Sequence, residues 1–192
     1  MNKSNAVLPR NIQEARNFEQ QGKEIPLHMF WGHYPEPDGS IGAGCLSQWW
    51  DAPFAENGII FRTCEHYMMY RKAILFHDID TSRRILNART PREAKMLGRK
   101  VRGFKDPVWE SERFQVVVQG NAQKFSQHAA LRAYLMSTRG RLLVEASPYD
   151  RVWGIGISRN DVRAQSPGKW LGSNLLGFAL SHVRDSILTE ER

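Results

Sequence analysis

The sequence predicts an α+β fold, a single and mostly helical domain with a small sheet. Helices dominate, because several long segments lack Gly and Pro and begin with a capping residue. Apolar runs of strand length are few and short. The chain has 192 residues, 41% of them hydrophobic, so one domain can bury a core without disulfides or a metal.

Composition also limits the compartment and the class of protein. Cys45 and Cys64 do not form a C-x-x-C motif, which indicates thiols in a reducing compartment. The start of the chain, MNKSNAVLPR, lacks the apolar segment of a signal peptide, and no apolar run approaches membrane-spanning length. The six histidines lack zinc-type spacing. We therefore expect a cytoplasmic protein with no membrane contact, no cofactor and no metal site.

The N-terminal part of the chain is predicted to differ from the rest. Residues 1–27 are expected to form an extension, and residues 28–190 the main domain. The extension contains one helical pattern, Ile12–Gln21. An apolar strand candidate, Ile25–Trp31, leads into a loop rich in Pro and Gly at Tyr34–Gly44.

A turn, a strand and a long helix are predicted next. Asn57-Gly58 is a strong turn signal in front of a short strand, Ile59–Phe61. The stretch Phe61–Phe76 then contains a helix with Thr63 as its N-cap, because the residues after Thr63 include neither Gly nor Pro.

Further helices are predicted as far as Gly140. The segment Thr90–Glu93 combines a capping box with Pro at the first helical position. The expected bounds are Asp80 or Thr81 to Ala88, Thr90 to Arg102 with Gly103 after it, Val108 to about Ala122, and Lys124–Met136.

Two strands and one helix complete the predicted fold. The first strand is apolar, and the second contains two glycines that allow a close backbone approach. The expected bounds are a strand at Arg141–Ala146, a strand at Val152–Ile157, a loop at Ser158–Lys169, and a helix capped by Ser173 or Asn174 that ends near Leu188.

The helix after Thr63 carries two charged residues on its apolar face. At about 100° per residue, Glu65 and Lys72 lie on one side, two turns apart, together with Met68 and Phe76. Burying a charge is costly unless it is paired or used. The pattern therefore indicates either a Glu–Lys ion pair or a carboxylate for acid–base catalysis beside a nucleophilic lysine.

Basic residues are concentrated in one window of the chain. The whole chain has a formal net charge of +7, whereas the window from Arg83 to Lys105 has nine basic residues and one acid, a net charge of +8. This pattern favours a phosphate-bearing partner, with a solvated basic surface as the alternative.

Short motifs in a fixed order carry a family resemblance. They are LSQWWDAPF, the T-x-E-H…K-A pattern of Thr63–Ala73, EAKMLGRKVRGF, FSQHAALRAYL, VEASPYDRVWGIG and WLGSNLLG. Each motif is weak alone, but together they resemble the NADAR family, also called YbiA-like, over roughly Phe30–Leu188. The resemblance implies a YbiA-like fold.

The resemblance also implies hydrolysis of an N-glycosidic bond at C1 of a ribose. Some members cleave phosphoribosylamino-pyrimidines, which are riboflavin-pathway intermediates, and others remove ADP-ribose from modified guanine bases in opposition to toxins. Some members carry an acidic residue between the glycines of the W-G-x-G motif. Ile155 occupies that position here, so a role for such an acid does not transfer.

Matched residue by residue, the family pattern implies catalytic roles for Glu65 and Lys72 and makes Asp150 a contact of water or ribose. We expect Glu65 to do the acid–base work, and the ring opening of ribosylamines allows Lys72 to act as a Schiff-base nucleophile. The residue types suggest the substrate-binding candidates: Trp153 beside Gly154 for the base, Asn174, Arg99 and Arg102 for phosphate, and Trp49 and Ser47 as pocket lining. Structural roles remain open alternatives, namely core packing for the tryptophans, a turn for Asp150 and a helix cap for Asn174.

We therefore expect an N-glycoside hydrolase whose partner is a small phosphorylated ribosyl-base or an ADP-ribosylated nucleic acid. One alternative is a module that binds ADP-ribose, NAD or nucleic acid without cleaving it, and another is a purely structural helical protein. The sequence leaves open which substrate is used, whether a Schiff base or direct water attack cleaves the bond, and the oligomeric state.

Overall fold

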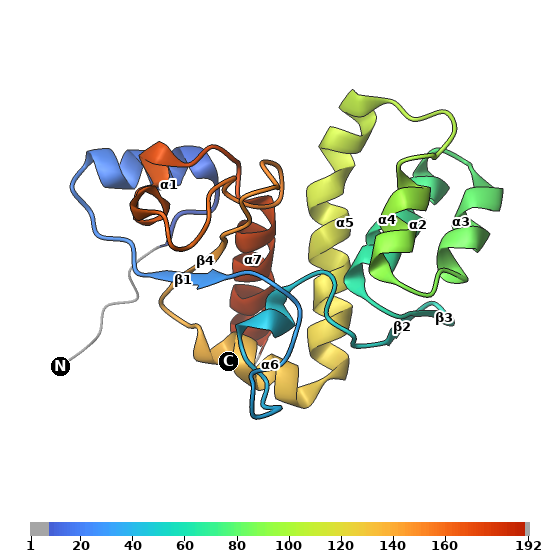
Figure 1. Ribbon diagram of the computed structural model, residues 1–192, viewed down its shortest axis with the longest axis horizontal. Helices are drawn as coiled ribbons and strands as arrows, with labels where there is room; N and C mark the ends of the chain where they lie inside the picture. Colours follow the sequence, from blue (N-terminus) through green and yellow to red (C-terminus); the bar gives the residue numbers. More distant parts are fainter. Residues whose placement is uncertain (1–7, 191–192) are drawn as a thin grey trace. The chain divides into compact units, whose positions relative to one another are not determined.

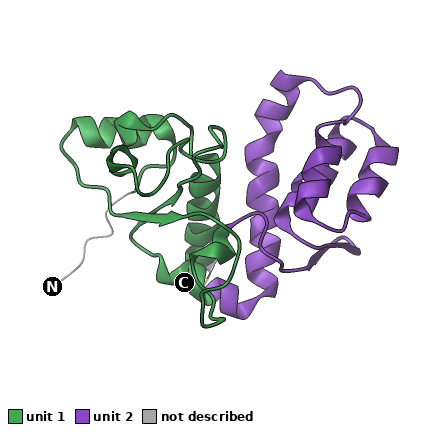
Figure 2. Ribbon diagram, in the orientation of Figure 1, with its two compact units in different colours: residues 1–46, 133–192 green, residues 47–132 purple. Residues whose placement is uncertain are grey.

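The computed structural model describes residues 8–190 and has the predicted α+β class, with helices as the main component. The chain divides into two compact units (Figure 2). Unit 1 combines residues 1–46 with 133–192, and unit 2 is the intervening segment 47–132. None of the helices between residues 8 and 190 is long and apolar enough to cross a membrane.

Unit 1 is organised around two parallel strands from distant parts of the chain. Strand β1 (Leu27–Phe30) pairs with β4 (Leu142–Glu145), with Leu27 opposite Leu142. Helix α7 (Leu175–Glu190) packs against β4 (Figure 1). Both strands were predicted, and the apolar run at the start of β4 explains why it is buried.

The N-terminal helix of unit 1 is held by a carboxylate. Helix α1 (Ile12–Gln20) lies within the predicted range and is capped by Asn11. Its Glu19 accepts hydrogen bonds from the Ser166 hydroxyl and, at 2.6 Å, from the Gly168 N–H. The unit also has three 3₁₀ turns in its described part: η1 (Ala43–Leu46), η2 (Val162–Gln165) and η3 (Pro167–Lys169).

Unit 2 consists of a hairpin and four helices. Strands β2 (Phe54–Glu56) and β3 (Ile59–Phe61) pair antiparallel across Asn57 and Gly58, whose φ angles of 52° and 79° suit a two-residue hairpin turn. Helix α2 packs against the other three helices of the unit (Figure 1). The helices are α2 (Cys64–Leu75), α3 (Ile79–Leu86), α4 (Pro91–Gly98) and α5 (Asp106–Gln127).

The helical run after residue 106 breaks at one histidine. His128 has φ −126° and ψ 93°, which ends α5 before α6 (Ala129–Ser137) begins. Its Nε2 atom lies 2.9 Å from the Pro53 carbonyl oxygen. The helical block predicted at Val108–Ala122 and Lys124–Met136 therefore divides at His128, a few residues later than expected, and the boundary between the units falls inside α6.

Two helix ends differ from the prediction. Helix α3 is capped by Asp78, not by Asp80 or Thr81, because Asp78 Oδ1 accepts from the Thr81 N–H at 3.2 Å. Helix α4 ends at Gly98 instead of Arg102. Gly98 packs directly on Met69, where a Cβ atom would overlap the sulfur atom.

The predicted strand Val152–Ile157 is wrong. The segment is an irregular turn in which Asp150 Oδ1 accepts from the N–H groups of Val152, at 2.9 Å, and Trp153, at 2.7 Å. The chain then returns to β4, since the Ile155 N–H donates to the Glu145 carbonyl at 2.9 Å. An Asx-type turn supplies the hydrogen bonds that a strand partner would otherwise provide.

Asp78 also joins α3 to the segment after α4. Its carboxylate accepts from the Arg102 guanidinium at 2.7 Å and from the Arg102 N–H at 2.9 Å. These hydrogen bonds hold the pKa of Asp78 well below its usual value. Since the ionised form is favoured in the folded state, the stabilisation is present above the unfolded pKa, about 4, and is lost as the pH falls below it.

We expect Asp78→Asn to lower the stability of unit 2 at pH 7, because Asn can still cap α3 but cannot pair with Arg102 as an anion. The difference from the wild type should narrow at pH 3, where the carboxyl group of the unfolded wild type is mostly protonated. Urea denaturation at both pH values measures it. An equal difference at the two pH values would contradict the role of the charge.

Candidate functional site

Glu65 lies in the first turn of α2 and is 3% exposed. The cap at Thr63 starts the helix, since its hydroxyl accepts from the His66 N–H. The Glu65 N–H donates to the Gln48 carbonyl at 3.0 Å, and the Trp49 indole Nε1–H donates to Glu65 Oε2 at 3.2 Å. The segment before β2 therefore orients the carboxylate, and two predicted site residues, Glu65 and Trp49, meet directly.

Helix α5 supports this segment with polar side chains that the sequence analysis did not select. Lys124 is fully buried, and its Nζ atom donates to the Ser47 carbonyl at 3.1 Å. Asn121, also fully buried, donates to Gln48 Oε1 at 2.9 Å. Lys124, Asn121 and Val117 share one face of α5 at helical spacing, and polar residues on that otherwise apolar face were the available signal.

The charges of this cluster act on a neighbouring thiol. Burial raises the pKa of Cys64 to about 11, with the Lys124 charge acting to lower it and the Glu65 charge to raise it. Cys64 therefore stays protonated, and its thiol donates towards the Gly120 carbonyl and Asn121 Oδ1, both 3.6 Å away. A protonated buried thiol is no nucleophile, so the reactive candidates here are the carboxylate and the amines.

Lys72 lies two turns beyond Glu65 on α2, about 10 Å of helix rise away. Its Nζ atom is 3.9 Å from the centre of the Phe104 ring and 5.7 Å from that of Trp109. Burial lowers the pKa of Lys72, and the Asp106 charge opposes this. The carboxylate that acts on the amine is therefore Asp106, and partial desolvation favours the neutral, nucleophilic form.

The predicted phosphate contacts differ in their surroundings. Arg99 is exposed at the C-terminus of α4. The Arg102 guanidinium is bound to Asp78 and, at 3.0 Å, to Asp80, which weakens the case for a phosphate contact there. Lys95 of α4 instead lies 5.9 Å from the centre of the Trp49 ring, so this residue of the basic window lies next to the Glu65–Trp49 pair.

The remaining predicted site residues belong to unit 1, where turn and packing roles are visible. Asp150 holds the turn described above. Trp153 in that turn is half-buried. A Cβ atom on Gly154 would lie 2.8 Å from the Glu145 carbonyl oxygen, so glycine is required for chain packing.

Asn174 does not cap α7 with its side chain. Its φ of 54° is in the left-handed region, which asparagine tolerates. Its Oδ1 atom accepts from the Glu145 N–H, and its Nδ2 atom donates to the Leu143 carbonyl, both at 2.9 Å. The amide is fully buried and joins the start of α7 to β4, which is a structural role.

The described residues offer no metal centre. Between residues 8 and 190 there is no group of three or more His, Cys, Asp or Glu side chains that could hold a metal ion. The polar cluster at the start of α2 contains Glu65, Trp49, Gln48, Asn121 and Lys124, which are hydrogen-bonding and acid–base groups.

Several known proteins with similar sequences are named N-glycosidases. The chain is 38% identical to N-glycosidase R617 of Acanthamoeba polyphaga mimivirus, over 75% of this chain and 88% of that protein. It is 32% identical to N-glycosidase YbiA of Escherichia coli, over 72% and 78%. It is also 35% identical to the chloroplastic riboflavin biosynthesis protein PYRR of Zea mays, over 69% of this chain and 21% of that longer protein.

The fold agrees with these matches. The NMR structure of E. coli YbiA superposes with a TM-score of 0.68 at 27% identity, covering 88% of both chains. The NADAR domain family model matches residues 29–188, which include parts of both units. The chain belongs to the NADAR family.

Proposed function

We propose that this chain, an N-glycosidase of the NADAR family, hydrolyses the bond between ribose C1 and the base nitrogen of a phosphoribosylamino-pyrimidine. The observation that carries the proposal is a buried carboxylate, Glu65, held by the Trp49 indole at the N-terminus of α2. The similarity to a riboflavin biosynthesis protein supports the choice of substrate class.

Glu65 is the proton donor and acceptor in this proposal. As the base leaves, C1 of the ribose develops oxocarbenium character, which a nearby carboxylate stabilises. The departing nitrogen needs a proton, and Glu65 in its acid form supplies it. Glu65 as carboxylate then takes a proton from the water that attacks C1.

Lys72 offers a second route that suits ribosylamines. When the ring opens, C1 is bound to the base nitrogen as an imine, and the neutral amine of Lys72 adds to C1. The base leaves as an amine after taking a proton, and Lys72 remains bound to C1 as an imine. Water then adds to C1, which releases the sugar aldehyde and restores the lysine. The lowered pKa of Lys72 supports this route.

Lys95 is the residue we propose for the substrate phosphate, because it lies beside the Trp49 ring. Lys95→Ala should raise KM roughly tenfold and change kcat little, since a phosphate contact far from C1 is kept in the ground state and the transition state alike. Lys100→Ala, a change at an exposed lysine two residues after the end of α4, is the control. A large fall in kcat with unchanged KM would argue against the phosphate role.

A second candidate substrate is ADP-ribosylated guanine in nucleic acid. The observation that favours it is the exposure of most of the basic window. The exposed residues are Arg83, Arg84, Arg89, Arg92, Arg99, Lys100, Arg102 and Lys105. Such a surface attracts a polyanion, and a protein that neutralises several phosphates binds with a steep dependence on salt.

Initial rates of base release distinguish the two candidate substrates. A phosphoribosylamino-pyrimidine and an ADP-ribosylated oligonucleotide are offered to the same preparation, each at low and high salt. We expect faster release of base from the pyrimidine substrate, with little effect of salt or of competing DNA. Faster release from the oligonucleotide, suppressed by salt and by competing DNA, would overturn this choice in favour of the second candidate.

A further inference from the structure

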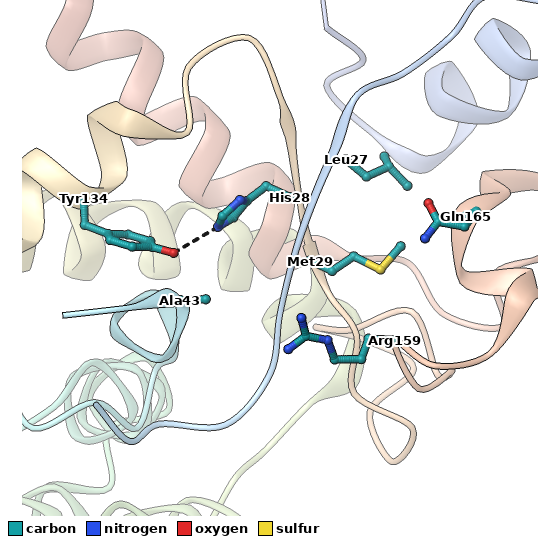
Figure 3. A pocket seen from close by; sticks show the side chains of 7 residues that line it. All are labelled: Leu27, His28, Met29, Ala43, Tyr134, Arg159 and Gln165. Carbon is teal, nitrogen blue, oxygen red and sulfur yellow. Dashed lines mark hydrogen bonds between the residues drawn. The ribbon is translucent and has the colours of Figure 1, made fainter. Parts of the chain in front are cut away.

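Unit 1 contains a cavity of about 470 Å³ beside β1 (Figure 3). One wall is formed by Leu27, His28 and Met29 of β1. The others come from η1, α6, η2 and the loop that follows Ile157, which contribute Ala43, Tyr134, Gln165 and Arg159. None of these side chains belongs to the proposed catalytic residues. The volume is in the range of small-molecule sites.

The outer edge of β1 has no strand partner among the described residues. The carbonyls of Pro26 and Phe30 accept from the N–H groups of Leu142, at 2.8 Å, and Ala146, at 2.9 Å, so even-numbered residues face β4. Because backbone groups alternate along a strand, the N–H and C=O of Leu27 and Met29 face the other way. In the part of the chain that the structure describes, β1 pairs with β4 alone.

One basic side chain, Arg159, lines this cavity. Arg159 is exposed, and its guanidinium lies at the cavity beside Met29 (Figure 3). Burial, followed by the charges of Arg141, Arg159 and Arg184, lowers the pKa of His28 to about 4. His28 is therefore neutral at pH 7, and its Nε2 atom lies 3.3 Å from the Tyr134 hydroxyl. The described residues that line the cavity include no acidic side chain, so an anionic ligand is favoured.

The backbone and side chains that line the cavity together define the class of ligand that can bind there. The Leu27 carbonyl and the Met29 N–H form an acceptor and a donor two residues apart on one edge, which matches the amino group and adjacent ring nitrogen of adenine or cytosine. Gln165 adds an amide donor and acceptor, and the Met29 side chain adds apolar surface. Two open residues are too few for the row of bonds by which an added peptide strand binds.

We propose that this cavity binds a nucleoside monophosphate, with the base on the Leu27–Met29 edge and the phosphate on Arg159. The residues of this cavity do not include Glu65 or Lys72, so the nucleotide is bound there without being cleaved. A planar, bidentate guanidinium is well suited to a phosphate.

Titration calorimetry with adenosine, guanosine, cytidine and uridine monophosphates tests the proposal on the full chain. We expect at least one of them to bind saturably, and Arg159→Ala to weaken that binding roughly 10- to 100-fold. Arg163→Ala is the matched control, because Arg163 is also exposed and nearby in sequence but pairs with Asp161 at 2.7 Å and does not line the cavity. The Arg163→Ala variant should bind the nucleotide with the same affinity as the wild type.

Two further measurements separate the contribution of the phosphate group to binding from that of the nucleoside, and binding in the cavity from catalysis. The corresponding nucleoside without phosphate should bind the wild type and Arg159→Ala equally, because it lacks the group that Arg159 contacts. Glu65→Gln should bind the monophosphate as the wild type does, which keeps this test independent of the proposed catalysis. The absence of saturable binding by all four nucleotides overturns the proposal. Equal affinity of the wild type and Arg159→Ala for the nucleotide would also overturn it. Loss of nucleotide binding in Glu65→Gln, or displacement of the nucleotide by an acidic peptide, would do the same.

Discussion

Glu65→Gln should lower kcat by about 10²- to 10⁴-fold, the usual contribution of one acid–base group. Gln has nearly the shape of Glu, and its amide oxygen can still accept from the Trp49 indole, so the fold and substrate binding should persist. Steady-state kinetics with a phosphoribosylamino-pyrimidine, together with thermal denaturation, measure both effects.

The control is Glu112→Gln, which removes an exposed carboxylate from α5. It should keep the wild-type kcat. A Glu65→Gln variant with near wild-type turnover would remove this carboxylate from the chemistry. The buried cluster would then be structural, and the search for the acid–base group would move to Asp150.

Lys72→Arg should abolish turnover if the imine route operates. Arginine keeps the positive charge and can still stack on Phe104, but a guanidinium does not form the imine. Incubation of the wild type with substrate and borohydride should add the mass of the reduced sugar to the peptide that contains Lys72, and should inactivate the enzyme. Peptide mass spectrometry detects the adduct.

Lys100→Arg, a change at an exposed lysine, is the control and should retain both activity and adduct formation. An active Lys72→Arg variant without any borohydride adduct in the wild type would contradict the imine. Cleavage would then proceed by direct attack of water with Glu65 as base.

The local elements of the fold could be predicted because their signals lie within a few residues. Thr63 caps α2, Thr90 and Pro91 start α4, and Asn57-Gly58 closes a hairpin, all as expected. Each of these depends on a side chain that bonds its own backbone neighbours or on a glycine at positive φ.

The error at the end of α4 comes from contacts between distant residues, and the error at 152–157 from a local hydrogen-bonded turn. Helix α4 ends early where Gly98 packs on Met69, and Arg102 is recruited by Asp78, 24 residues before it. The strand expected at 152–157 is replaced by a turn because the Asp150 carboxylate satisfies two backbone N–H groups. Periodicity in the sequence contains no information about such partners.

The candidate site could be predicted only in part, because some of its residues meet through contacts between distant segments. The helical pattern and the family resemblance selected Glu65 and Lys72, but the pattern also suggested that they pair, whereas Lys72 faces Asp106 and aromatic rings. Lys124 and Gln48 were missed. They join the site through hydrogen bonds to segments more than 70 residues apart in the chain, Lys124 to Ser47 and Gln48 to Asn121.

The identity of the products tests the central claim most directly. The wild type is incubated with one phosphoribosylamino-pyrimidine, and the mixture is resolved by liquid chromatography and mass spectrometry. The account predicts free aminopyrimidine and ribose 5-phosphate in equal amounts, with the formation of both slowed about 10²- to 10⁴-fold by Glu65→Gln. Recovery of the intact substrate after binding to the wild type, or cleavage at any bond other than C1–N, would contradict it.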